Sequence, residues 1–291
     1  MRNKFNGVEW NAVAETVRDV NQRFWNNKDI PYLTIRTTCH STQSYKAHSH
    51  SELSIGIIES GETRLSLPDG NVVLKKDDII LIEPNIVHAC NPVANGPRSY
   101  HMLYIDNGWC CETLSKIYGY EVTQYHCEQK LHSVMEGDTD LSGLMFKLLD
   151  QPSQSVVTEV ESRLLNLVSR HCVPQRHNEV ESELVAQLRD RLLQDIASAP
   201  SLDVVSQELG RPKETLIRLF KKQLGITPKA FLNNSRIERA KILLKSGMNI
   251  VDVAAEVGYS DQSQLHRTFV NYTASTPRQY QQVTSIFDNN C

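Results

Sequence analysis

The sequence predicts an α+β protein of two domains: an N-terminal β-barrel followed by helices, and a C-terminal all-α domain with two helix-turn-helix motifs joined by a long helix. Three observations support this prediction. Short β-like runs separated by turns fill residues 30–106, helical periodicity begins near residue 108, and one pattern occurs twice in the last third of the chain. A chain of 291 residues is long enough for two domains of ordinary size.

Residues 30–106 are predicted to be β structure because short apolar or alternating runs follow one another between turn residues. The runs cover residues 53–58, 63–67, 72–74, 79–82 and 100–105. The turns between them include Ser60-Gly61 and Pro68-Asp-Gly70. Strands this short and this closely spaced predict a sandwich or a small barrel.

From about residue 108 the apolar residues recur at helical spacing. Residues 144–149 place leucines on one face, and residues 157–168 form a second apolar face. Residues 172–178 interrupt this pattern and are predicted to be the interdomain linker, and the helix that follows is expected to end near Pro200. These boundaries divide the chain into a barrel domain at 1–125, a helical region with the linker at 126–180, and a C-terminal domain at 181–291.

The C-terminal third contains the most specific pattern. Its first copy is Val205-Ser-Gln-Glu-Leu-Gly210 followed by Leu216, Arg218, Phe220 and Thr227-Pro228, and its second is Val253-Ala-Ala-Glu-Val-Gly258 followed by Leu265, Arg267, Phe269 and Thr276-Pro277. From the leucine onward the two copies are shifted by 49 residues. A short helix, a turn opened by glycine and a second helix ending in an aromatic residue outline a helix-turn-helix, which reads duplex DNA. Leucines at helical spacing fit any helical bundle, but packing alone does not produce two copies of the whole frame.

A recognition helix presents the side chains of its first turns to base edges in the major groove. The candidate DNA-contacting residues, on the outer faces of the predicted recognition helices 213–223 and 261–271, are Lys213, Glu214, Ile217, Arg218, Lys221, Gln262, Ser263, His266 and Arg267. The two arginines suit guanine or phosphate, and Gln262 suits adenine. Thr227-Pro228 is expected to begin a connecting helix of about 18 residues, roughly 27 Å long, which would place the recognition helices about one DNA turn apart.

The charge distribution favours a nucleic-acid partner at one end of the chain. The net charge is −3, but residues 201–282 hold 12 Lys and Arg against 7 Asp and Glu, whereas residues 1–180 hold 17 against 22. No apolar run approaches the ~20 residues of a membrane helix, and the first residues lack the apolar stretch of a signal peptide. The seven cysteines are scattered and form no CxxC pair. We therefore expect a cytoplasmic protein with reduced thiols and no membrane partner.

Residues 183–282 resemble the AraC/XylS family of bacterial transcription regulators. The resemblance rests on residues 253–269 and on Thr276-Pro-Arg-Gln-Tyr280, which follow the family signature nearly throughout. The chain departs from that signature at Ser206, Leu265 and Ala274. The resemblance implies binding to double-stranded promoter DNA and control of RNA polymerase, more often by activation than by repression. It also implies a homodimer formed through helices at about 139–172, whose alternative role is packing against the barrel of the same chain.

Three histidines in the N-terminal half form a second recognisable pattern. His48-Ser-His50-Ser-Glu52 precedes one predicted strand, and Pro84-Asn-Ile-Val-His88 follows another. A His-x-His pair with a distant histidine after a proline turn resembles a cupin barrel. In metal-dependent cupins such histidines bind iron, manganese or zinc together with a glutamate. Here Ser54, Ile55 and Gly56 stand where that glutamate usually lies, so we expect no metal and no cofactor.

The matching interpretation is the cupin-like effector domain common at the N-terminus of AraC/XylS regulators, in which the barrel holds a small molecule. The candidate effector-binding residues are Tyr45, His48, His50, Glu52, His88 and Tyr104, with Trp109 nearby. For any one of the histidines, binding to turn backbones at the barrel rim is an equally good alternative.

Together these patterns predict a DNA-binding regulator, not an enzyme, that responds to a small-molecule effector. Three alternatives stay open. The chain could be a metal-dependent cupin enzyme fused to a DNA-binding domain. It could be a constitutive regulator whose barrel only dimerises and is filled by its own side chains. It could also be a redox sensor that uses the adjacent Cys110 and Cys111.

Overall fold

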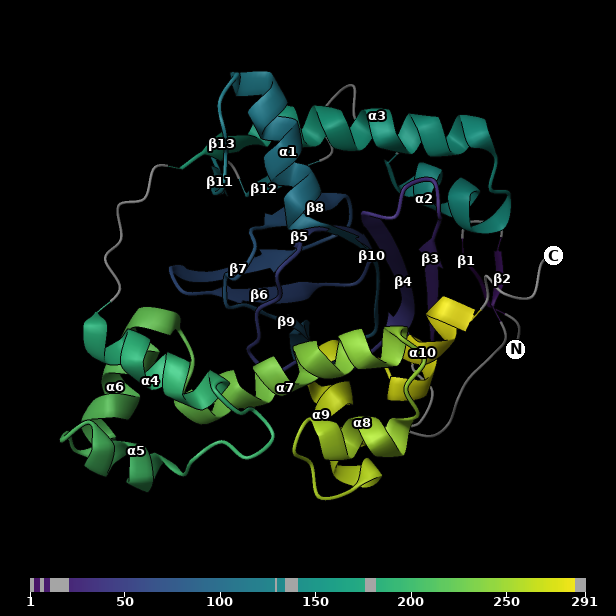
Figure 1. Cartoon of the computed structure of the whole chain (residues 1–291). Coiled ribbons are helices and arrows are strands. Elements are labelled where there is room, and N and C mark those ends of the chain that lie inside the picture. The colour runs from purple at the N-terminus through teal and green to yellow at the C-terminus, as the bar shows by residue number, and fades with distance from the viewer. Residues whose placement is uncertain are drawn as a thin grey trace.

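The computed structural model describes residues 3–5, 8–10, 21–128, 130–133, 141–175 and 182–285. A β-rich N-terminal domain lies above a helical C-terminal domain in Figure 1. The α+β, two-domain fold predicted from the sequence is confirmed, including its two helix-turn-helix motifs and the long helix between them.

Two antiparallel β-sheets form most of the N-terminal domain. The larger sheet contains β3 (Gln22–Asn26), β4 (Leu33–Ser41), β5 (Leu53–Ser60), β8 (Asp78–Ile82), β10 (Arg98–Ile105) and β12 (Leu131–Ser133), in the order β12-β8-β5-β10-β4-β3. The smaller sheet contains β6 (Thr63–Leu67), β7 (Gly70–Leu74) and β9 (Ala89–Pro92), in the order β7-β6-β9, and a 3-10 turn, η1 (Val93–Asn95), follows it. Two short pairs join β1 (Asn3–Phe5) to β2 (Val8–Trp10) and β11 (Tyr125–Cys127) to β13 (Cys172–Pro174).

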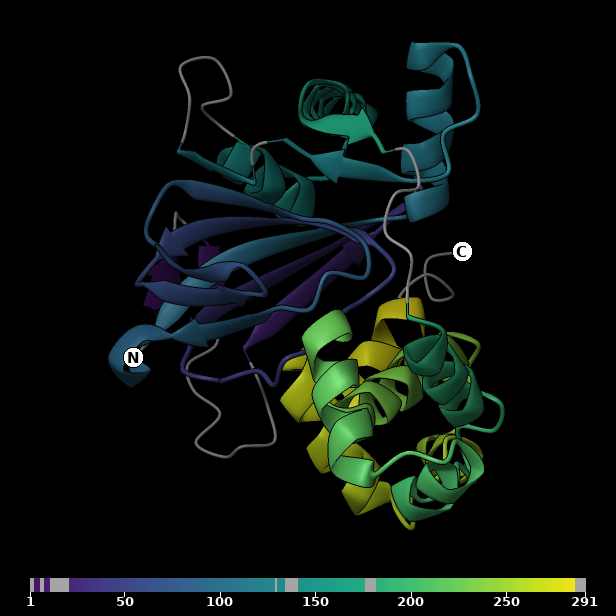
Figure 2. The ribbon, with the colours of Figure 1, turned by 90° about the vertical axis from the view of Figure 1, so that its left-hand side faces the viewer.

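The larger sheet is covered on its outer face by three helices, α1 (Asn107–Tyr118), α2 (Leu141–Asp150) and α3 (Gln154–His171). Figure 2 shows these helices on the side of the sheets away from the C-terminal domain. Because side chains alternate along a strand, Ile55 and Ile57 pack with the helices, whereas Ile58 packs between the two sheets. Burial on both faces explains why β5 and β8 are nearly uninterrupted apolar runs.

The structure corrects several element predictions. Residues 172–174 are not linker: they form β13, in which Cys172 lies opposite Cys127 of the antiparallel strand β11. Both cysteines are free thiols. The sequence pattern does not predict β11, β12 or β13, because strands of three residues carry too little periodicity. Residues 176–178 of the predicted linker lie outside the described residues. Helices α2 and α3 lie in the region expected either to form a dimer or to pack against the barrel of the same chain, and their apolar faces pack against the sheet of their own chain.

The C-terminal helices form two small bundles joined by one long helix. The first bundle contains α4 (Glu183–Leu193), α5 (Leu202–Glu208) and α6 (Lys213–Leu224), and the second contains α8 (Ile250–Glu256), α9 (Gln262–Thr273) and α10 (Pro277–Ser285). They are joined by α7 (Pro228–Lys245), whose first turn is capped by Thr227, as predicted: its Oγ1 accepts from the main-chain N–H of Ala230 at 3.3 Å. Helix α4 ends well before the predicted end near Pro200, because the Asp195 carboxylate binds the main-chain N–H groups of Ala197 and Ser198 in a turn.

The turn of the second helix-turn-helix requires glycine. Gly258 has φ 78°, and a Cβ atom added to it would lie 2.2 Å from the carbonyl oxygen of Ala197. Gly210 takes the equivalent place in the first copy with φ 60°. At the ends of the recognition helices the copies differ: Gly225 ends α6, whereas Ala274 ends α9 with φ 51°, a backbone conformation that costs a residue with a Cβ atom about 1–2 kcal/mol.

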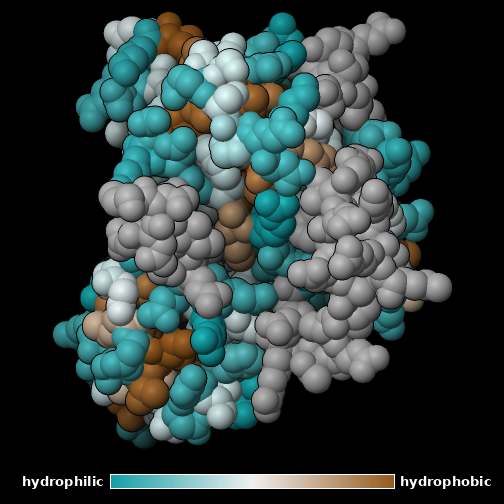
Figure 3. Space-filling model, turned by 90° about the vertical axis from the view of Figure 1, so that its right-hand side faces the viewer, coloured by the Kyte–Doolittle hydropathy of each residue, from teal (hydrophilic) through white to brown (hydrophobic). Residues whose placement is uncertain are grey.

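The barrel binds the C-terminal end of α9. Arg36 Nη1 donates to the carbonyl of Thr273 at 2.5 Å, and Gln22 Nε2 donates to that of Ala274 at 2.8 Å. The main-chain N–H of Lys46 donates to the carbonyl of Asn271 at 2.9 Å. The last carbonyls of a helix have no intrahelical donor and carry partial negative charge, so these contacts satisfy them. Figure 3 shows hydrophobic residues gathered at the level of the C-terminal helices. Among the described residues, Ile242 of α7 is 59% exposed and Val251 of α8 is 61% exposed.

Candidate functional site: the DNA-facing helices and the interdomain cavity

The two recognition helices present most of the candidate DNA-contacting residues to solvent. On these helices Glu214, Arg218, Lys221, Gln262, Ser263 and Arg267 are exposed, and Lys213, Ile217 and His266 are half-buried. Asp261 begins α9 as its N-cap, because its carboxylate accepts from the main-chain N–H of Gln264 at 2.7 Å. The barrel holds only the other end of α9. Its first two turns therefore remain open to a duplex.

The basic residues on these helices differ in whether they already have an ion-pair partner. Lys213 Nζ lies 2.8 Å from the carboxylate of Asp203 on α5, so part of its charge is already neutralised. In contrast, within the described residues neither Arg218 nor Arg267 has a hydrogen-bond or ion-pair partner within 4 Å. Arginines in this state can make bidentate contacts to guanine or phosphate without first breaking an internal ion pair.

A cavity of about 150 Å³ lies between the barrel and the C-terminal domain. Its lining includes five of the six candidate effector-binding residues: Tyr45, His48, His50, Glu52 and Tyr104. The sixth, His88, lines a smaller cavity of about 30 Å³ inside the barrel, and this cavity shares His48, His50 and three other residues with the first. Trp109 lies elsewhere, since its ring stacks on Tyr32 with the centroids 4.3 Å apart and it lines neither cavity.

The cavity contains charged residues that the sequence pattern does not single out. Arg36 comes from β4, and Glu238, Lys241 and Lys245 come from α7. No local signal marks them, because their positions relative to the barrel depend on how the two domains dock. A basic residue in the middle of the predicted buried strut, such as Lys241, is the one sequence feature that could have drawn attention to this wall.

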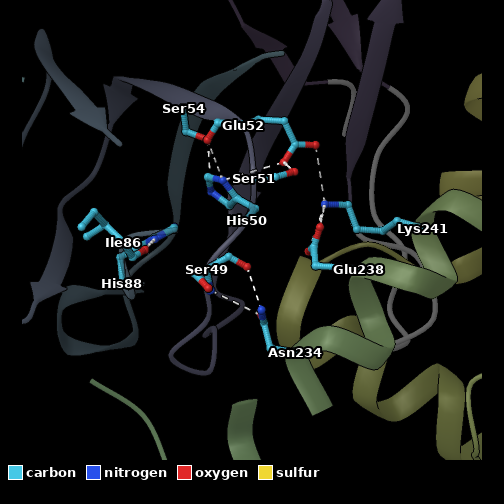
Figure 4. A network of polar contacts seen from close by, with 10 residues as sticks. All are labelled: Ser49, His50, Ser51, Glu52, Ser54, Ile86, His88, Asn234, Glu238 and Lys241. Carbon is cyan, nitrogen blue, oxygen red and sulfur yellow. Dashed lines mark hydrogen bonds and ion pairs between the residues drawn. The ribbon is translucent and has the colours of Figure 1, made fainter. Parts of the chain in front are cut away.

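The charged groups around Lys241 form a small network. Lys241 Nζ lies 2.8 Å from Glu238 and 3.9 Å from Glu52, so it bridges α7 and the barrel (Figure 4). Burial alone lowers the pKa of Lys241, but the two carboxylates outweigh it and raise that pKa, so the ammonium group stays charged. Next to this network, Asn234 Nδ2 donates to the carbonyl of Ser49 at 2.9 Å. The same helix that joins the two helix-turn-helix motifs thus contacts the barrel rim.

The three histidines meet at the barrel rim. The ring centroids of His48 and His88 are 4.5 Å apart, and those of His50 and His88 are 4.9 Å apart. Each ring binds a turn carbonyl through Nδ1: His48 binds Lys46 at 2.7 Å, His50 binds Glu52 at 3.0 Å and His88 binds Ile86 at 2.9 Å. A carbonyl can only accept, so each Nδ1 carries the proton and each Nε2 keeps a lone pair.

The three rim histidines and a fourth buried histidine, His101, predict that the protein loses stability in acid. Burial lowers the pKa of His101 to about 3 and that of His88 to about 4, and it also lowers the pKa values of His48 and His50. An unfolded histidine titrates near 6.5, so the neutral side chains stabilise the fold fully above that pH, and this contribution is lost as the pH falls towards the folded values. We expect the free energy of unfolding to fall between pH 6.5 and 5 by up to about 1.4 kcal/mol per pH unit for each histidine, measured by urea denaturation.

Replacing His101 tests this prediction. Its Nδ1 lies 2.6 Å from Thr37 Oγ1, and the Glu59 carboxylate, 3.7 Å from Nε2, is beyond hydrogen-bonding distance. Burial therefore dominates its titration. The variant His101→Gln should show a shallower slope over the same pH range, and an unchanged slope would contradict this assignment.

The cysteines give little support to a redox sensor. Cys110 is buried, and burial raises the pKa of its thiol to about 12. The thiolate is the reactive form of cysteine, and this environment suppresses it at neutral pH. The half-buried Cys111 next to it also has a raised pKa, because burial disfavours its thiolate.

This fold, with two exposed recognition helices and a barrel beside a cavity, defines a helix-turn-helix transcription regulator with a ligand-binding domain. A family model described as an AraC-like ligand binding domain matches residues 30–168, and one described as a helix-turn-helix domain matches residues 205–282. The chain belongs to the AraC family of transcriptional regulators, which are not enzymes.

Curated relatives agree with this family. The HTH-type transcriptional regulator YbfI of Bacillus subtilis is 27% identical over 231 residues, which cover 77% of this chain and 82% of YbfI. A second HTH-type regulator, from Haemophilus influenzae, is 27% identical over 274 residues, 82% of this chain and 90% of its own length. Both are described as uncharacterised, so they extend the family assignment without adding an effector.

Solved structures share the fold. A substituted apo form of ToxT from Vibrio cholerae has a TM-score of 0.55 at 14% identity and covers 87% of this chain and 98% of its own. ToxT bound to an unsaturated fatty acid has a TM-score of 0.51 at 15% identity, with 91% and 97% coverage. Identities this low show the common fold alone.

Among the described residues, no helix has the length and apolar character needed to span a membrane.

Proposed function

We propose that the chain is a cytoplasmic activator of transcription that responds to a small carboxylate-bearing effector in the interdomain cavity. The observation that carries this proposal is the composition of the cavity wall, which combines the barrel rim with Lys241 of α7. An effector placed there contacts the sensor domain and the helix joining both DNA-reading motifs. Its binding free energy then depends on how the domains are arranged, which is the requirement for a population shift.

The cavity offers a carboxylate three basic groups, on Arg36, Lys241 and Lys245. Three carboxylates line it as well, on Glu52, Asp106 and Glu238, and burial raises the pKa of Glu238, which disfavours its negative charge. The histidines add no charge, because burial lowers the pKa values of His48 and His50. Aromatic side chains complete the wall: Phe24, Tyr32, Tyr45, Tyr104, Tyr272 and Tyr280. A compact molecule with one carboxylate and an apolar part matches this surface.

The rest of the proposed mechanism concerns DNA and partners. The nine candidate residues of α6 and α9 would contact promoter DNA, and the exposure of their first turns supports this. RNA polymerase would be recruited by the DNA-bound protein, and a homodimer would form through the outer surface of α3, where Leu165 is 47% exposed. The constitutive alternative requires a barrel filled by its own side chains, and the cavity inside the barrel is indeed only about 30 Å³, roughly the volume of one water molecule. The ligand-responsive function is supported instead by the cavity of about 150 Å³ between the barrel and the C-terminal domain.

The variant Lys241→Met tests the effector proposal. Removing one partner of a buried, charge-assisted contact typically costs 2–5 kcal/mol, so we expect carboxylate affinity to fall by about 30-fold or more. The measurement is the shift in melting temperature of the full-length protein with a panel of small carboxylic acids, amino acids and neutral sugars. Promoter affinity is then measured with and without each compound that stabilises the protein.

Lys229→Met is the matched control, since Lys229 lies on the same helix but is exposed and does not line the cavity. It should respond to carboxylates as the unsubstituted protein does. Stabilisation by neutral sugars alone, or an undiminished carboxylate response in Lys241→Met, would remove the basis of the proposal.

A further inference from the structure

The three rim histidines bring their ring nitrogens close together. One nitrogen each from His48, His50 and His88 lies within 4.8 Å of the other two, and among the described residues no other set of three or more His, Cys, Asp or Glu side chains has this geometry. Nitrogen ligands about 2.0–2.1 Å from a tetrahedral zinc ion are roughly 3.4 Å from one another. Ring rotations that move each nitrogen by about 1 Å would therefore close the set around one ion.

The hydrogen bonds of the rings prepare them for this role. Metal-binding histidines almost always donate their second ring N–H to a carbonyl or carboxylate, which fixes the tautomer and the ring orientation. Here all three Nδ1 atoms bind main-chain carbonyls, and the main chains of His48 and His88 also bind each other at 2.8 and 3.0 Å. Each Nε2 thus keeps a lone pair, and that of His50 accepts a hydrogen bond from Ser54.

We propose that His48, His50 and His88 bind one divalent first-row transition-metal ion through their Nε2 atoms and leave its remaining coordination positions facing the interdomain cavity. Neutral imidazole suits zinc, copper, iron and nickel. The absence of the cupin glutamate, which led the sequence pattern to predict no metal, does not exclude such a site. Three histidines with one open position are a known zinc arrangement.

Two neighbours of the site shape its properties. The hydroxyl of Ser54 lies 3.1 Å from His50 Nε2 and donates to it, so this hydroxyl must turn away when the nitrogen binds an ion (Figure 4). The carboxylate of Glu52 lies 4.0 Å from His50 Nδ1 and compensates part of the added charge. If the proposed effector is a carboxylate, the open positions place the ion where it adds attraction for that group. Only this last step rests on the proposed function.

The test uses full-length protein without a histidine tag, freed of metal with a chelator and titrated with Zn²⁺ and then with Co²⁺. We expect one ion per chain, together with the visible absorption of Co²⁺ in a site of low coordination number. In His48→Ala the affinity should fall by on the order of 100-fold or more, since loss of an outer-shell partner alone costs 10–100-fold. This variant should keep its fold, because His48 is half-buried and bonds to His88 through its main chain.

His126→Ala is the matched control, because His126 is exposed on β11 and lies outside the cluster. It should bind both ions like the unsubstituted protein. Circular dichroism of each variant separates loss of the site from loss of the fold. Unchanged affinity in His48→Ala, or no binding beyond weak association shared by all variants, would overturn the metal site. The titration contains neither effector nor DNA, so its failure would leave the proposed function standing, and a failed effector screen would leave the metal site standing.

Discussion

Replacing Phe269 with alanine should unfold the second helix-turn-helix. Phe269 is fully buried and packs with Leu265, Tyr272 and the apolar face of α7, and its ring meets that of Tyr280 edge to face at 5.6 Å. Truncating a buried phenylalanine typically costs 3–5 kcal/mol, through lost transfer free energy and the cavity left behind. A loss of this size is a large part of the stability of an ordinary domain. Urea denaturation of the full-length protein measures it.

Two further variants serve as comparisons for Phe269→Ala. Phe220→Ala changes the equivalent buried residue of the first copy and should destabilise the first bundle by a similar amount. Val251→Ala shortens a side chain on α8 that is 61% exposed, and it should change the free energy of unfolding by less than about 0.5 kcal/mol. A loss below about 1 kcal/mol for Phe269→Ala would mean that the second bundle is packed differently.

Replacing Arg267 or Arg218 with alanine should weaken DNA binding by about 1–3 kcal/mol, roughly five-fold to 150-fold, without destabilising the fold. Both side chains are exposed on the outer faces of their recognition helices, so truncation removes no core contact. The measurement is sequencing of the genomic fragments retained by the protein at near-physiological salt, followed by affinities for the recovered site. If both recognition helices contact bases, the recovered sites should contain two half-elements about one turn of the duplex apart.

The pattern of loss distinguishes the two kinds of contact. If an arginine reads guanine, its variant should relax specificity at one base pair, and if it binds phosphate, its variant should weaken all sequences and lower the salt slope by about one. Arg64→Ala, an exposed substitution on β6 of the barrel, should leave affinity unchanged. Sequence-blind retention that neither recognition-helix variant alters would count against both helices as specific readers.

Much of the fold follows from local patterns. The strands at 53–60, 63–67 and 78–82 are detectable because apolar or alternating runs end at turn residues, and α3 because its apolar residues recur every three or four positions. The cap at Asp261 and the glycine at position 258 likewise have local causes. Patterns of this length fail for β11, β12 and β13, whose three residues form strands only because partners far away in the chain supply their hydrogen bonds.

The candidate site likewise contains residues that the sequence predicts and residues that it does not. The motif around His48 and His50 precedes a strand, so a position at the barrel rim is predictable, and five of the six expected effector residues do line one cavity. Arg36 and Lys241 carry no such local mark. They belong to this cavity because the barrel binds the end of α9 and Glu52 lies 3.9 Å from Lys241.

By itself the sequence determined the two-domain order, the duplicated helix-turn-helix and the outward faces of its recognition helices, because each depends on spacing within one or two turns of a helix or strand. Only the tertiary structure decided that three histidines from two separate segments bring one ring nitrogen each within 4.8 Å of one another. It also decided that a lysine of the connecting helix lines the interdomain cavity. Contacts of these kinds depend on distances between segments that the chain brings together only by packing, and no periodicity in the sequence encodes such distances.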